Sequence, residues 1–307
     1  MTIARFSVLL LVLVAGGCFG GAVGPRLPTV AAQEQDLRDK GHHALLSGDV
    51  ARAGQFFDEE RRLAESFDDR AGLAGALNDL GLVAGLLGNP GKAAEFHRRA
   101  HEIALELGDR ALIADSLSYR GQAAHLMGDH ATALAFYTQA LALAREVNDR
   151  RGEAAVLNNL GLLQQAKGEM DQAEQSFQRA LALNTEKGER RAMASNLSNL
   201  GAVSEKRGHW PEARGLYERA LALDKEMELR PAIEADLVSL GQLSEVEHRL
   251  DEAISYYDRA YRGYRMLNQV PKAVDVLTRL IRVVKAAGQE PLAAAYQAEL
   301  KTLTTKP

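Results

Sequence analysis

Small and apolar residues recur along the chain with a period of 40 residues. One position of the repeat always holds leucine, and the position sixteen residues later always holds alanine. Glycine stands four residues after the leucine in six of the seven units, and an aromatic residue usually follows that glycine by sixteen. The leucines are Leu37, Leu77, Leu117, Leu157, Leu197, Leu237 and Leu277, and the alanines are Ala53, Ala93, Ala133, Ala173, Ala213, Ala253 and Ala293. Columns at one spacing indicate a repeat architecture.

Each unit predicts two helices joined by a short turn. In the fourth unit, Leu157 and Leu160 recur at helical spacing until Gly168 interrupts the pattern. The segment that follows places Ala173 and Phe177 on one helical face, so we expect Leu157 and Ala173 to be buried. A single helix pair cannot bury its apolar face, and stacked neighbours are needed to build a continuous core.

At these offsets the leucine, glycine, alanine and aromatic positions resemble those of the tetratricopeptide repeat in its 40-residue form, as in kinesin light chains and bacterial peptide-sensing receptors. The resemblance implies an all-α fold, a right-handed α-solenoid of about seven helix pairs. It covers residues 34–303 and leaves residues 304–307 as a tail. The expected units lie near residues 34–70, 71–110, 111–150, 151–190, 191–230, 231–270 and 271–303.

Residues 1–17 predict a secretory signal peptide, because Arg5 precedes an apolar run from Phe6 to Ala15 that ends in small residues. This run is too short to span a bilayer as a helix, which takes about 20 residues. The chain's one cysteine, Cys18, stands where cleavage would fall, so the segment resembles a bacterial lipoprotein signal. That resemblance implies a lipid on Cys18, a flexible tether over residues 18–33, and a place in the bacterial cell envelope, with the outer membrane favoured where the cell has one. The alternative is an ordinary cleaved signal and a secreted or periplasmic protein.

Charge and composition narrow the function classes. The chain has 37 basic and 41 acidic residues and a net charge of −4, so we expect no nucleic-acid partner. One cysteine excludes a disulfide framework and a cysteine-based metal site. His97 and His101 lie one helical turn apart, but no third ligand stands beside them, and we interpret the pair as packing residues. No catalytic motif occurs in the sequence, so we predict neither enzyme activity nor a metal or cofactor.

Polar residues within the first helices are the candidate binding residues, because the resemblance implies that first helices line a concave groove. Asparagine recurs there although it is a poor helix former. An amide both donates and accepts, which suits the backbone of an extended peptide; the alternative is that these amides bond to neighbouring turns. We expect Asn158, Asn159 and Asn199 to lie together and to be solvent-accessible. The candidates are Asn78, Tyr119, Gln122, Asn158, Asn159, Gln165, Asn199 and Gln242, with Arg279 and Arg282 of the last unit as either a solvated cap or an anchor for an acidic segment.

These patterns together predict a membrane-tethered, extracytoplasmic scaffold that binds a protein or an extended peptide in the groove. The resemblance extends to lipoproteins that help to assemble envelope machines, although no motif selects one of them. Two alternatives remain open at this stage. One is a structural protein that self-associates into homo-oligomers through its end units, and the other is a peptide-sensing regulator.

Overall fold

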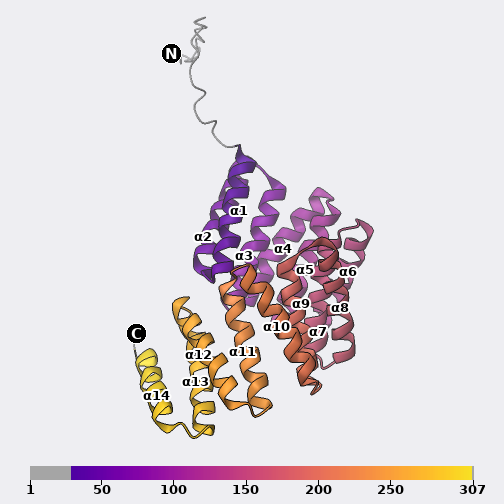
Figure 1. Ribbon diagram of the computed structural model, residues 1–307. Coiled ribbons are helices and arrows are strands. Elements are labelled where there is room, and N and C mark those ends of the chain that lie inside the picture. The colour runs from indigo at the N-terminus through magenta and orange to yellow at the C-terminus, as the bar shows by residue number, and fades with distance from the viewer. Residues whose placement is uncertain (1–28, 306–307) are drawn as a thin grey trace, which may run out of the picture.

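The computed structural model describes residues 29–305, which form fourteen α-helices and no strand (Figure 1). The predicted signal peptide, Cys18 and most of the predicted tether lie outside the described residues. The helices are α1 (Val30–Ser47), α2 (Val50–Phe67), α3 (Arg70–Leu86), α4 (Pro90–Leu107), α5 (Arg110–Leu126), α6 (His130–Glu146), α7 (Arg150–Ala166), α8 (Met170–Lys187), α9 (Arg190–Lys206), α10 (Trp210–Glu226), α11 (Arg230–Val246), α12 (Leu250–Met266), α13 (Val270–Ala286) and α14 (Glu290–Thr305).

Successive helices pack against each other in pairs, and the pairs stack into a curved array (Figure 1). The all-α solenoid of seven helix pairs is therefore confirmed. Helix α1 begins at Val30, where the hydroxyl of Thr29 accepts a hydrogen bond from the backbone N–H of Ala32 at 3.3 Å. Residues 30–33, which the sequence assigned to the tether, are thus helical. None of the helices between residues 29 and 305 has the length and apolar character that crossing a membrane requires.

The repeated glycine leaves space for the aromatic side chain sixteen residues later, which packs against it. A Cβ atom on Gly161 would lie 2.5 Å from the ring of Phe177, and one on Gly121 would lie 2.6 Å from the ring of Tyr137. These distances are shorter than real contacts, so in the first six units the second helix packs a ring directly on the backbone of the first helix. Leu157 is 5% exposed and Ala173 is fully buried, so both core predictions are confirmed.

Aspartates that precede several of the helices act as caps. Asp69 and Asp149 each accept a hydrogen bond at 2.9 Å from a backbone N–H three residues later. Such a bond satisfies one of the free N–H groups at a helix start and is worth about 1 kcal/mol. These caps help to fix where α3 and α7 begin, and therefore which of their side chains face the neighbouring units.

Arg120 occupies a place where most units have leucine. Its guanidinium lies over the ring of Phe136, 4.2 Å from the ring centre. This cation–π contact, together with the aliphatic stem of the arginine, replaces the packing that a leucine would give.

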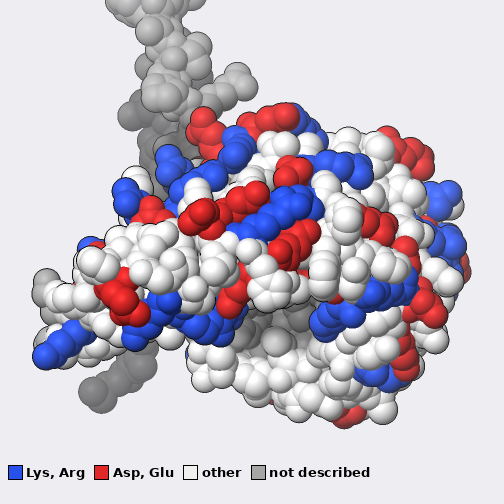
Figure 2. All heavy atoms as spheres, turned by 60° about the horizontal axis from the view of Figure 1, so that its bottom comes forward, with Lys and Arg blue, Asp and Glu red and all other residues white. Residues whose placement is uncertain are grey.

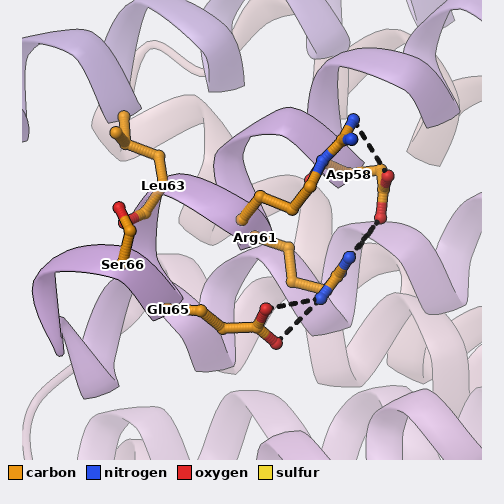
Figure 3. A network of polar contacts seen from close by, with 6 residues as sticks. Asp58, Arg61, Leu63, Glu65 and Ser66 are labelled. Atoms are coloured by element: carbon orange, nitrogen blue, oxygen red, sulfur yellow. Dashed lines mark hydrogen bonds and ion pairs between the residues drawn. The ribbon is translucent and has the colours of Figure 1, made fainter.

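A row of ion pairs runs along the second helix of the first unit. The Arg61 guanidinium contacts Asp58 at 2.8 Å and Glu65 at 2.7 Å, and all three residues lie on α2 (Figure 3). Pairs at this helical spacing each stabilise a helix by about 0.2–0.5 kcal/mol. These ion pairs lie within α2 and support the helix.

The curvature of the array brings its first and sixth units together. Helix α1 contacts α11, and in Figure 1 the end of α1 lies near the start of α11. Gly48, which ends α1 with φ of +84°, lies against Gln269 and Pro231. A Cβ atom at this position would overlap the Gln269 side chain. The equivalent turn glycine Gly88 has open space around it. The described part of the chain therefore closes on itself over about six units.

Candidate functional site

A hollow with a volume of about 370 Å³ lies between the first helices of the third, fourth and fifth units. Helices α5, α7 and α9 supply most of its wall, since their middle turns face one another across the stack. Among the predicted site residues, Tyr119, Gln122, Asn158 and Asn159 line it. Figure 2 shows one hollowed face of the molecule, on which acidic and basic side chains are interspersed and form no single-sign patch.

Asparagine amides form a connected network in the wall of this hollow. The Asn158 side-chain oxygen accepts hydrogen bonds from the amides of Asn196 and Asn199, both at 2.9 Å. Asn196 in turn accepts one from the amide of Asn184 at 2.7 Å. Asn159 donates a longer bond of 3.4 Å to the Ser118 hydroxyl.

Asn158 and Asn199 lie together in this network, while the neighbouring Asn159 bonds to Ser118 instead. All three side chains are half-buried and keep some access to solvent. The sequence did not indicate how fully Asn158 is bonded. Its oxygen already has two donors, one of them from Asn196, whose side chain is only 1% exposed. Sequence reasoning missed Asn184 and Asn196. The available signal was that Asn184 stands where the preceding units have Ala104 and Ala144.

Asn78 was predicted to face the groove, and the structure places it in the core. Its side chain is 4% exposed, and its oxygen lies 3.2 Å from Nδ1 of His97. His97 fills the aromatic position over Gly81, is 1% exposed, and has its pKa lowered to about 4 by burial. Asn78 is drawn inward because a polar ring in this position needs a hydrogen-bond partner.

Tyr119 stands between the core and the hollow. Its ring stacks on His97 with centres 5.1 Å apart and an angle of 13° between planes. Burial raises the pKa of the Tyr119 phenol. His101 bonds to the Ser116 hydroxyl at 2.9 Å, so neither histidine of this pair is directed at the other. Between residues 29 and 305, no three His, Cys, Asp or Glu side chains come together as a metal site.

The remaining predicted residues lie away from the hollow. Gln165 lies near the end of α7, and Gln242 lies in the second half of α11. Both side chains are half-buried, and neither lines the hollow. Arg279 pairs with Asp275 on its own helix at 3.1 Å, and Arg282 pairs with Glu245 of α11 at 2.8 Å. The two arginines of the last unit thus bond within the array.

Charged residues enter the hollow from the starts of the first helices. Burial raises the pKa of Asp115 to about 6, with a further rise from the nearby Asp149 and a lowering by Arg151. Arg151 lies 3.9 Å from Glu189. Burial lowers the pKa of Arg191, which the carboxyl of Asp224 partly opposes.

Behind the hollow, the next junction between units holds two buried acids. Asp236 accepts a hydrogen bond from the Ser198 hydroxyl at 2.7 Å, while its other oxygen has no partner in the described residues. Burial raises the pKa of Asp236 to about 7 and that of Asp224 to about 6, and the two carboxyls interact. One proton shared between them would supply the missing hydrogen bond.

Comparisons with known proteins agree with this architecture. A family model described as tetratricopeptide repeat matches residues 78–146, 112–186 and 152–226 in overlapping segments. No curated protein sequence matches the chain.

Several solved structures share the fold. BtubC from P. vanneervenii is 24% identical, with a TM-score of 0.57 over 73% of this chain and 92% of that one. PilF of Pseudomonas aeruginosa is 23% identical, with a TM-score of 0.54 over 76% and 92%. A Rap protein complexed with competence and sporulation factor is 16% identical, with a TM-score of 0.63 over 90% and 76%. The family match shows that residues 78–226 consist of tetratricopeptide repeats, and the solved structures share the fold of stacked helix pairs that continues on both sides of this segment.

Proposed function

We propose that this protein is a scaffold that holds an extended peptide segment of a partner protein in the hollow between α5, α7 and α9. One observation carries the proposal: amides and hydroxyls, together with a few charged side chains, line an open hollow between packed helices. Gln122 and Asn159 have side-chain groups left over for a ligand, since within residues 29–305 Asn159 makes only one long side-chain bond and Gln122 makes none. Each amide can meet both the N–H and the C=O of a peptide backbone.

The closed form of the array favours a narrow partner. Because α1 contacts α11, the first six units form a closed curve, and their inner face is enclosed by the helices of these units. A segment of extended chain fits such a space, whereas a folded domain would have to part the units. The Rap protein of similar fold was solved with a bound factor, which supports an equivalent use of the fold here. The proposal assigns the protein no catalytic step, metal or cofactor.

We further propose that the array is tethered outside the cytoplasm by a lipid on Cys18 and acts in the bacterial cell envelope. The support is the sequence of residues 1–18 alone. Wild-type protein is expected to incorporate labelled palmitate and to sediment with membranes, while Cys18→Ser is expected to incorporate none. An unlabelled wild-type protein would contradict the tether and would leave the binding proposal standing.

Peptide binding is tested with the full chain and a displayed library of random twelve-residue peptides. We expect wild type to select peptides and Gln122→Ala/Asn159→Ala to bind the selected peptides at least tenfold more weakly, because each lost hydrogen bond costs about 0.5–1.5 kcal/mol. Gln175→Ala is the matched control, since Gln175 is exposed on α8 and lies outside the hollow. Equal binding by both variants would move the site away from the hollow.

A further inference from the structure

One cation in the hollow lacks an ion pair. Four charged residues line the hollow: Asp115, Arg151, Glu189 and Arg191. Arg151 has Glu189 at 3.9 Å. In the described residues no carboxylate oxygen lies within 4.0 Å of the Arg191 guanidinium, and no side-chain hydrogen bond engages it.

Arg191 is exposed at the hollow, and the protein around it removes only part of the solvation of its charge. Its side chain reaches solvent through the hollow, yet enough protein surrounds it to lower its pKa. Asp224 lies behind it, but that carboxyl is 5% exposed and its own pKa is raised to about 6, so it neutralises the guanidinium only in part. A charge in such a place attracts a counter-charge more strongly than one in open water does. Arg219 on α10 is also exposed, but it lies outside the hollow.

We propose that Arg191 binds the carboxylate of an aspartate or glutamate side chain in the peptide segment that occupies the hollow. This inference rests on the proposed function and names the chemistry of its partner. A planar guanidinium fits a carboxylate with two parallel hydrogen bonds, which adds orientation to attraction. Gln122 and Asn159 then hold the backbone, and Arg191 fixes the register of the segment against them.

An internal side chain fits the site better than a chain terminus does. The hollow lies in the middle of the array, with α3 before it and α11 beyond it, so first helices continue on both sides. A bound segment therefore runs past Arg191 in both directions. Asp115, on the opposite side of Arg151, disfavours a second acidic residue at that end of the segment.

The test uses the full chain and a synthetic array of twelve-residue peptides that are N-acetylated and C-amidated, with the same peptides carrying a free carboxyl end as a second arm. We expect wild type to bind peptides with Asp or Glu at one fixed position, and to lose at least tenfold in affinity when that residue becomes Asn or Gln. Arg191→Gln is expected to bind acidic and amide peptides equally. Arg219→Gln, the matched control, is expected to keep the wild-type preference. Thermal melting of each variant establishes that it is folded.

Any other result contradicts a specific part of the proposal. Peptides bound without any acidic preference, or a preference that survives Arg191→Gln, would refute the role of Arg191 and leave peptide binding intact. Binding only to peptides with a free carboxyl end would replace the internal side chain by a terminus and so refute the proposal as stated. Binding of no peptide by folded wild type would refute the proposed function itself.

Discussion

Two neighbouring junctions between helix pairs solve the same packing problem with opposite chemistry. At the junction of the third and fourth units, Ala144 and Val156 fill the contact, 1% and 2% exposed. Forty residues later Asn184 and Asn196 occupy the equivalent positions, 5% and 1% exposed, and are hydrogen-bonded to each other. The helices meet in the same way in both places, so the fold does not require either choice.

The difference shows what the polar junction is for. A buried amide without a partner costs several kcal/mol, so an asparagine pair persists only where its groups are satisfied. Asn196 meets this condition by donating onward to Asn158 at the wall of the hollow. The apolar junction has no such connection. The polar junction thus positions a groove residue, which the contact between Ala144 and Val156 does not do.

The first prediction concerns what the two junctions share. Leu157 and Leu197 occupy the same column beside the apolar and the polar junction, 5% and 2% exposed. Leu157→Ala and Leu197→Ala are each expected to lower the free energy of unfolding by about 2–5 kcal/mol, through lost burial and the cavity left behind. Denaturant titration measures both. A neutral effect at one junction only would show that the two are not packed alike.

The second prediction concerns the acidic junction formed by Asp224 and Asp236. The folded protein keeps these carboxyls protonated up to about pH 6 and 7, whereas the unfolded chain releases its protons near pH 4. The folded state therefore binds more protons in this range, and stability falls as pH rises from about 4 to 7. Asp224→Asn/Asp236→Asn, which copies the neighbouring asparagine junction, is expected to be more stable than wild type at pH 8 by about 2–3 kcal/mol.

Melting temperatures from pH 4 to pH 8 give the check. The control is Glu218→Gln, an exposed acid on α10 for which the stability profile should keep the wild-type slope. An unchanged slope in the double asparagine variant would mean that the acid pair is ionised in the folded protein. That result would also restore full charge to Asp224 behind Arg191.

The third prediction breaks the link between junction and groove. Asn158→Ala removes the oxygen that accepts from Asn196 and Asn199, and leaves a donor of the buried Asn196 without its partner. We expect a loss of about 1–3 kcal/mol in unfolding free energy. A triple alanine variant of Asn158, Asn159 and Asn199 should lose at least as much. A melting temperature equal to wild type would mean that water replaces the network.

The sequence predicted the helices and the core because both depend on spacing along one chain. The leucine column and the glycine with its aromatic partner sixteen residues later are local patterns, and the structure follows them. Whether an asparagine side chain points into the core or into the hollow depends on hydrogen-bond partners about 40 residues away in the sequence. Asn78 and Asn158 share one column, yet Asn78 turns inward to His97 while Asn158 accepts from the next unit. Period alone cannot decide between these, although the histidine in an aromatic column was a visible sign.

The smallest expected effect on stability is that of Asn159→Ala, which distinguishes this residue from the adjacent Asn158. Asn159 makes only the 3.4 Å bond to Ser118 and lines the hollow, so Asn159→Ala removes little from the fold. Alanine also has the higher helix propensity, by up to about 0.7 kcal/mol. We expect its melting temperature to stay within about 2 °C of wild type, which for this size corresponds to roughly 1 kcal/mol. Peptide affinity should fall in the same variant, because its amide faces the ligand. Asn159→Ala that lost stability as Asn158→Ala does, while peptides still bound, would assign both asparagines to the junction and remove the amides from the binding site.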